Sequence, residues 1–319
     1  MSSNVNLTVA KDLKNDEFYT RYEDIEKELA NYTQHFKNKV VYCNCDFPSL
    51  SSFWKYFHIN FNSLGLRKLI TTHYWDGMNP TYKTEYIGGD DGNIGEYRKI
   101  PLKGDGDFRS RECLDLLKES DIVVTNPPFS LAREYIISLV KNNVSFLCIG
   151  DLNWITYKEV FPLLRSNRIW LGNNSVKEFI QPDGSIKKFG NKLWFTNLDH
   201  NKRHVKLSLY KRYDVGEYPK YDNYNAVECG KVDNIPIDYR GVMGVPITYL
   251  NKHNPEQFEI VGLANGNFKS NSSDELKKLV SYVDGFKDKG GCPLINGKLI
   301  YPRILIRGGI KSLGVNSPD

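Results

Sequence analysis

The sequence contains no apolar run of about 18 residues, the length that a membrane-spanning helix needs, so we expect no membrane segment. Its N-terminus also lacks a basic stretch followed by an apolar one, so nothing indicates a secretory signal. The six cysteines form no C-x-x-C pair and the six histidines are scattered, so we expect no metal site. Cysteines in apolar surroundings are typical of proteins in a reducing compartment. These absences together favour a cytoplasmic protein.

The composition is that of a globular protein. Apolar residues make up 40% of the 319 residues and charged residues 25%. These fractions exclude a largely disordered chain and a small disulfide scaffold. The length suits one large domain or two smaller ones, each able to bury a core.

The positive charge is concentrated in one segment. The net charge is +5, but residues 158–220 hold 13 Lys and Arg against 6 Asp and Glu. The rest of the chain is therefore slightly acidic. A basic segment on a near-neutral body is typical of nucleic-acid-binding proteins, because phosphate contacts supply most non-specific affinity. The alternative is a solvated, lysine-rich surface.

Strand-like and helical patterns alternate through the first 200 residues. The strand-like runs are residues 38–43, 66–72, 121–125 and 145–150, and the helical patterns are 22–36, 110–120 and 130–140. A T-x-x-E pattern at Thr156 predicts a further helix that ends near Arg165, and two short strands follow at 168–171 and 192–196. This alternation predicts an α/β fold with a parallel sheet and with ligands at the carboxyl ends of the strands.

The pattern loosens beyond residue 200 into segments rich in Tyr, Asn, Gly and Pro, with one clear helix after Ser272. We therefore place a soft domain boundary near residue 200. It separates residues 1–200 from residues 201–319.

One tetrapeptide, Asn126-Pro127-Pro128-Phe129, follows the strand-like run DIVVT directly. Two prolines cannot continue a sheet, so the backbone turns rigidly at the carboxyl end of the strand. The turn would present the side-chain oxygen of Asn126 and the carbonyl of Pro127 as two fixed acceptors, which suit the two hydrogens of an exocyclic NH2 group. Phe129 supplies an apolar surface for an extruded base. The alternative is an ordinary Asn-Pro turn with a packed Phe.

This motif is the signature of the S-adenosylmethionine-dependent amino-methyltransferases of DNA, and further stretches resemble the EcoRI-type adenine-specific DNA methyltransferases. The resemblance runs from about residue 15 to residue 260 and resumes at residues 303–306. It includes DEFYT (16–20), VVYCNCD (40–46), GDGDFRS (104–110), SDIVVTNPPFS (120–130), YPKYDNY (218–224) and GVMGVPIT (241–248).

The resemblance implies a class I, Rossmann-like methyltransferase sheet in residues 1–200 and a target-recognition region in 201–319, with recognition loops that begin near residue 172. It also implies transfer of a methyl group from S-adenosylmethionine to N6 of an adenine that is flipped out of duplex DNA. The catalytic residues would then be Asn126, Pro127, Pro128 and Phe129.

The same resemblance assigns the cofactor residues. The methionine end would lie at Phe18, Tyr19 and Thr20, and the amino acid portion near Asp46. Asp107 would accept a hydrogen bond from the adenine amino group of the cofactor, and Phe108 would stack on its ring. The glycine-rich loop of the wider superfamily is absent, since residues 45–51 read CDFPSLS.

For DNA binding we expect contributions from Lys187, Lys188 and Arg203, within the basic segment where the resemblance is poorest. The sequence does not separate base-reading from phosphate-binding residues here. We expect a monomer. A restriction endonuclease would be a genetic rather than a physical partner.

Three alternatives stay open from the sequence. Cytosine-N4 methylation also uses an exocyclic amine, although Ser-Pro-Pro is its commoner motif. RNA or protein-glutamine methyltransferases share N-P-P-[FY]. A DNA-binding protein without catalysis is suggested only by the absent glycine-rich loop.

Overall fold

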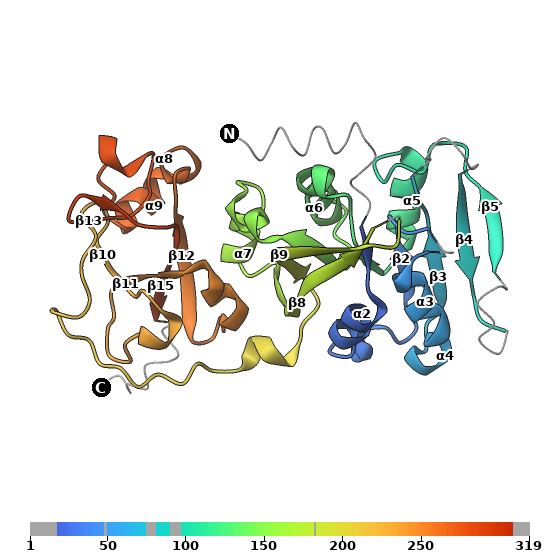
Figure 1. The fold of residues 1–319 in the computed structure, drawn as a ribbon, viewed down its shortest axis with the longest axis horizontal. Coiled ribbons are helices and arrows are strands. Elements are labelled where there is room, and N and C mark those ends of the chain that lie inside the picture. The colour runs from blue at the N-terminus through green and yellow to red at the C-terminus, as the bar shows by residue number, and fades with distance from the viewer. Residues whose placement is uncertain (1–17, 48–49, 75–80, 90–96, 182, 309–319) are drawn as a thin grey trace, which may run out of the picture. The chain divides into compact units, whose positions relative to one another are not determined.

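The computed structural model describes residues 18–47, 50–74, 81–89, 97–181 and 183–308. They belong to two compact units. The first unit reaches Trp154 and includes residues 170–200, and the second contains residues 155–169 and the chain from Asn201 onward (Figure 1). Each unit has its own sheet and its own core.

The first unit is built on a nine-stranded sheet with the order β1-β8-β9-β7-β6-β2-β3-β4-β5. Strands β3, β2, β6 and β7 are parallel, and the pairings of the outer strands are antiparallel. The strands are β1 Tyr19–Thr20, β2 Val40–Cys43, β3 Lys68–Thr71, β4 Tyr82–Tyr86, β5 Arg98–Pro101, β6 Ile122–Thr125, β7 Ser145–Asp151, β8 Trp170–Ile180 and β9 Ile186–Thr196. The predicted α/β fold is confirmed, but the sheet is mixed rather than parallel throughout.

Two helices of this unit begin at a serine that caps them. Ser51 accepts hydrogen bonds from two backbone N–H groups of α3, and Ser110 accepts one from α5. The helices are α2 Tyr22–Leu29, α3 Ser52–Ile59, α4 Phe61–Leu64, α5 Arg111–Glu119 and α6 Ala132–Lys141. The helix predicted over 22–36 is shorter in the structure, since α2 ends at Leu29 and a 3-10 turn follows at Thr33–His35.

The strand order reverses beside β2. The chain moves from β2 to β3 on one side, and later returns to β6 on the other side of β2. In open α/β sheets, ligands bind at the carboxyl ends of the two strands that flank such a reversal. Here those ends lead into Asn44–Phe47 and into Asn126–Phe129.

The second unit has a four-stranded sheet with the order β10-β11-β15-β12 and a small two-stranded hairpin. Its core includes Val261, Phe268, Leu276 and Leu305. The elements are α7 Phe161–Arg165, β10 Ala226–Glu228, β11 Val242–Pro246, β12 Phe258–Ala264, α8 Phe268–Asn271, α9 Asp274–Leu279, β13 Leu294–Ile295, β14 Lys298–Leu299 and β15 Arg303–Gly308. The helix predicted after Ser272 is present as α9, which Ser273 caps. The helix predicted from Thr156 is wrong at its start, because α7 begins only at Phe161.

Within the described ranges, no helix is long and apolar enough to cross a bilayer. The same residues contain no group of three or more His, Cys, Asp or Glu arranged to hold a metal ion. All six cysteines are free thiols. Burial raises the pKa of the Cys43 and Cys148 thiols, so these groups stay protonated at neutral pH.

A buried carboxylate, Glu28, joins α2 to β8. Its side chain is 0% exposed. It accepts hydrogen bonds from the backbone N–H of Asn173 at 2.7 Å and of Asn174 at 2.8 Å, and from the Tyr32 hydroxyl at 3.0 Å. A Cβ at Gly172 would lie 2.3 Å from this carboxylate, so only glycine fits there. The register of β8 against β9 shifts at this point.

We predict that Glu28→Ala destabilises the protein by about 3 kcal/mol, because two backbone N–H groups of β8 lose their buried acceptor. Urea unfolding followed by circular dichroism measures the loss. Glu26→Ala, an exposed change on the same helix, is the matched control. Equal stability of the two variants would show that water replaces the Glu28 carboxylate without cost.

Candidate active site

The N-P-P-F segment forms the turn that its prolines dictate. It leaves the carboxyl end of β6, passes through a 3-10 turn at Phe129–Leu131 and enters α6. Pro127 is buried, whereas Asn126 and Phe129 are partly exposed. The helical pattern predicted from residue 130 thus begins two residues later, because Ser130 lies within the 3-10 turn and α6 begins without a side-chain cap.

The side chain of Asn126 is fixed through its amide nitrogen, whereas its oxygen is available. Its Nδ2 donates a 2.7 Å hydrogen bond to the carbonyl oxygen of Phe18. Its Oδ1 is buried and has no hydrogen-bond partner among the described residues. Because an amide nitrogen must donate to a carbonyl, this bond decides which end of the amide is the oxygen. A buried acceptor without a partner costs about 1–3 kcal/mol, which indicates a place for a ligand.

The predicted Phe-Tyr-Thr element lies beside this turn. Tyr19 and Thr20 form β1, which pairs antiparallel with the end of β8. The Phe18 ring stacks on Phe129 with centroids 5.7 Å apart and planes 17° apart. Thr20 is 3% exposed, and its hydroxyl oxygen has no partner among the described residues. Residues 16 and 17 of the same motif lie outside the described residues.

Two phenylalanines that the sequence analysis did not assign complete an aromatic cluster. Phe179 of β8 and Phe189 of β9 lie 5.9 and 5.8 Å from Phe129, both nearly perpendicular to its ring. Phe189 also lies 5.0 Å from Phe18. The sequence predicts only short strands at 168–171 and 192–196, but the structure has a hairpin of two 11-residue strands. We call Phe18, Phe129, Phe179 and Phe189 the aromatic cluster.

A buried lysine from the same hairpin faces the motif. Lys192 is 5% exposed, and its Nζ lies 3.6 Å from the Phe129 ring centroid, within the range of a cation–π interaction. Its Nζ also lies 3.1 Å from the carboxylate of Asp151, which accepts a 2.8 Å bond from Asn191. The only sequence signal for Lys192 is its place in the basic segment.

The carboxylate of Asp46 links the two strand ends at the reversal. It accepts a 2.7 Å hydrogen bond from the hydroxyl of Thr125, the residue before Asn126, and a 2.8 Å bond from Ser51. Asp46 is 8% exposed. Burial raises its pKa to about 6, although both hydroxyl bonds act in the opposite direction. A carboxylate held in this way attracts a cation.

The loop before α5 reaches the same edge of the sheet through Phe108. Its ring is 6% exposed and meets Tyr135 edge-on at 5.1 Å, and the Tyr135 hydroxyl donates to Asn44 at 2.6 Å. Gly106 has a φ of +75°, and a Cβ there would lie 2.0 Å from the carbonyl oxygen of His73. The loop can therefore approach β3 only with glycine at this position.

Asp107, the predicted acceptor for the cofactor, is already paired. Its two carboxylate oxygens accept bonds of 2.9 and 2.6 Å from the guanidinium of Arg109. These bonds raise the pKa of Arg109. Arg109 also donates to Glu134 of α6 at 2.8 Å. A ligand at Asp107 must therefore share its carboxylate with Arg109.

The residues predicted to bind DNA fall in both units. Lys187 and Lys188 are exposed near the end of the β8–β9 hairpin, where Lys188 lies 3.3 Å from Glu178. Lys188 is the first cause of a lowered pKa of Glu178, and Arg21 is another. Arg203 belongs to the second unit, where its guanidinium donates to Asn167 at 2.5 Å.

The first unit thus gathers at one sheet edge a buried amide oxygen, a buried carboxylate and a cluster of aromatic rings. The amide oxygen suits an amine donor, and the rings suit a flat apolar ring. The carboxylate suits a cationic group. These are the groups that methylation of a nucleobase amine requires.

Comparison with known proteins agrees with this chemistry. A family model described as adenine-specific methyltransferase EcoRI matches residues 6–309. The Type II methyltransferase M.EcoRI of Escherichia coli is 46% identical, covering 96% of this chain and 97% of that protein. The Type II methyltransferase M.MpnI of Mycoplasma pneumoniae is 37% identical, over 93% and 96%. No solved structure matches. The chain therefore belongs to the EcoRI family of adenine-specific methyltransferases.

Proposed function

We propose that this adenine-specific DNA methyltransferase transfers a methyl group from S-adenosylmethionine to N6 of an adenine rotated out of duplex DNA. The observation that carries the proposal is the buried Oδ1 of Asn126, which has no partner among the described residues. The family assignment supports adenine as the target and does not favour cytosine-N4 methylation.

The acceptors of the turn match the donors of the adenine amino group. One N6 hydrogen binds Asn126 Oδ1 and the other binds the carbonyl of Pro127. Both oxygens belong to a turn held by two prolines, so they need no reorganisation during the reaction. Two hydrogen bonds of this kind localise the nitrogen lone pair for attack, and the extra proton leaves after transfer. No strong base is required.

The target base requires a shift within the aromatic cluster. A base that stacks on Phe129 meets the Phe18 ring, whose centroid lies 5.7 Å away. Lys192 also contacts the Phe129 ring, but its ion pair with Asp151 fixes its side chain. Phe18 bonds Asn126 only through its backbone oxygen, so its side chain is the one that can move. We infer that the Phe18 side chain rotates away while its carbonyl keeps Asn126 oriented.

The cofactor would lie at the reversal of strand order. S-adenosylmethionine supplies an electrophilic methyl group on a sulfonium. The buried Asp46 carboxylate would bind its cationic amino group, and Phe108 would contact its adenine ring. Thr20, with a buried hydroxyl oxygen that lacks a partner among the described residues, would contact its methionine end. Asp107 would accept from the adenine amino group while it keeps Arg109.

The parallel strands and their reversal beside β2 support a class I, Rossmann-like assignment for this sheet. Target recognition would involve residues 201–319 and the β8–β9 hairpin. A monomer, a cytoplasmic location and a separately encoded restriction endonuclease complete the proposal. The Type II names of the relatives support the endonuclease, and the six free thiols support a reducing compartment.

Asn126→Ala tests the central step. Loss of one pre-organised acceptor should lower kcat for DNA methylation by roughly 100-fold or more, because that hydrogen bond strengthens in the transition state. Transfer of labelled methyl to duplex DNA measures it. Calorimetry should show S-adenosylmethionine affinity within a few-fold of wild type. Turnover like that of the wild type would end the assignment of Asn126.

The pKa of Asp46 gives a pH dependence. The ionised carboxylate binds the cationic amino group, and the pKa lies at about 6. Affinity for S-adenosylmethionine should therefore be about tenfold weaker at pH 5 than at pH 7, where the Asp46 carboxylate is ionised and an α-amino group, with a pKa of about 8, is still protonated. Asp46→Asn should bind weakly at every pH, with the slope abolished. A variant that keeps the pH slope would exclude Asp46 as its source.

Lys187 and Lys188 test the hairpin as a DNA-binding element. Replacing both with Gln should reduce the slope of log K against log salt by about 0.9 for each phosphate that the lysines neutralise in the wild type. Fluorescence anisotropy with cognate and scrambled duplexes across a salt series measures it. Lys141→Gln is the matched control, since this exposed lysine ends α6 at the opposite edge of the sheet. If the double variant behaves like the control, the hairpin does not bind DNA.

A further inference from the structure

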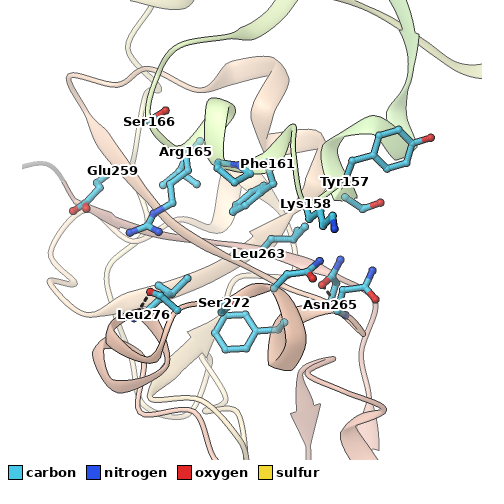
Figure 2. A pocket seen from close by; sticks show the side chains of 17 residues that line it. Tyr157, Lys158, Phe161, Arg165, Ser166, Glu259, Leu263, Asn265, Ser272 and Leu276 are labelled. Carbon is cyan, nitrogen blue, oxygen red and sulfur yellow. Dashed lines mark hydrogen bonds between the residues drawn. The ribbon is translucent and has the colours of Figure 1, made fainter. Parts of the chain in front are cut away.

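The second unit contains a pocket of about 490 Å³ that the proposed chemistry does not use. The segment around α7 forms one wall, and β12, α8 and α9 form the other (Figure 2). All of its lining residues belong to the second unit. Its floor is apolar, with Phe161, Leu263 and Leu276 among the lining residues.

One of the two cations that line the pocket has no ion-pair partner among the described residues. Lys158 and Arg165 lie on the α7 wall. Arg165 forms no ion pair with any residue within the described ranges, and Lys158 lies 3.8 Å from Glu159. The acid that lines the pocket, Glu259, is paired with Arg307 at 2.8 Å. An anion that enters therefore meets Arg165, which has no ion-pair partner among the described residues, and one carboxylate, Glu259, that is already paired.

The opposite wall offers the amide donor of a largely buried residue, Asn265. Asn265 follows β12 and is 6% exposed. Its Oδ1 accepts a 3.0 Å hydrogen bond from the backbone of Asn267, so the amide orientation is fixed. Its Nδ2 lines the pocket and donates to none of the residues that the structure describes. The Ser272 and Ser273 hydroxyls lie on the same wall.

Three other cations of the basic segment lie beside carboxylates. Lys192 is buried against Asp151, Lys188 lies beside Glu178 and Lys211 beside Glu217. Arg165 is free of such a carboxylate within the described residues and also lines a cavity. Its charge is therefore available to a ligand.

The shape of the pocket decides which part of DNA it fits. Base edges lie on the floor of a groove, so residues that read them must protrude from the protein. Backbone phosphates form the convex ridges of the duplex, and a concave site with cations and N–H donors receives them. We propose that this pocket binds a backbone phosphodiester of the DNA substrate through Arg165, Lys158 and the Asn265 amide. The inference rests on the proposed DNA methyltransferase function.

The double variant Lys158→Gln/Arg165→Gln tests the proposal. DNA affinity should fall on the order of tenfold, equally for cognate and scrambled duplexes. The salt slope should decrease by about 0.9 if the pocket neutralises one phosphate in the wild type. Arg168→Gln is the matched control, because this exposed arginine follows α7 without lining the pocket. It should leave affinity and slope unchanged.

Asn265→Asp gives a second variant at the same site. It keeps the acceptor for Asn267 and replaces the pocket donor with an anion, so DNA affinity should fall while the fold is retained. In both pocket variants, kcat at saturating DNA and S-adenosylmethionine affinity should match the wild type. If the wild-type protein methylates no DNA, the proposed function is refuted. That result is distinct from a failure of the pocket assignment, which the DNA affinities of the variants decide.

Two results would overturn the pocket assignment. In one, the double variant has the DNA affinity and salt slope of Arg168→Gln. In the other, calorimetry shows that the wild type binds deoxyadenosine monophosphate or inorganic phosphate and that the double variant does not, while the double variant keeps the DNA affinity of the wild type. The pocket would then serve a free phosphate compound rather than the DNA backbone.

Discussion

The active site depends on one hydrogen bond, from the Thr125 hydroxyl to the buried carboxylate of Asp46 at 2.7 Å. It joins the ends of β6 and β2, the two strands beside which the sheet order reverses. The other oxygen of Asp46 binds Ser51, which caps α3. One carboxylate thus sets the spacing between the N-P-P-F turn and the loop after β2. Burial removes water from the carboxylate and raises its pKa to about 6, and the two hydroxyl hydrogen bonds partly offset this loss of solvation.

The sequence predicts this part of the molecule because the signals are local. Apolar runs predict the parallel strands, and two prolines force the turn that carries Asn126. The N-P-P-F motif predicts that Oδ1 of Asn126 is an available acceptor, but it does not predict what fixes the orientation of the amide. That orientation needs the carbonyl of Phe18, which lies 108 residues away in the chain. No local pattern could reveal the contact.

The β8–β9 hairpin shows where such reasoning fails. Its strands pair with two register shifts, so alternation of polar and apolar residues is broken at Leu171–Ser175 and Val176–Glu178. The first shift is held by Glu28, a carboxylate of α2 whose sequence context is that of an ordinary surface residue. Phe179, Phe189 and Lys192 were missed for the same reason. In the second unit, the capping pattern at Thr156 predicted a helix that begins five residues too early, since local propensity is a weak guide against tertiary packing.

The two sites have opposite hydrogen-bonding character, which matches the two ligands that we propose for them. At the N-P-P-F turn, the group left without a partner is an acceptor, the Oδ1 of Asn126. In the pocket of the second unit it is a donor, the Nδ2 of Asn265, and the nearby ions are cations. The Asn126 oxygen is buried, so its lack of a partner costs about 1–3 kcal/mol and indicates a ligand that donates. The Asn265 residue lines the pocket, where its amide donor is open to a ligand that accepts. An exocyclic amine supplies donors and a phosphodiester supplies acceptors. DNA carries both groups, and one substrate can therefore satisfy both sites.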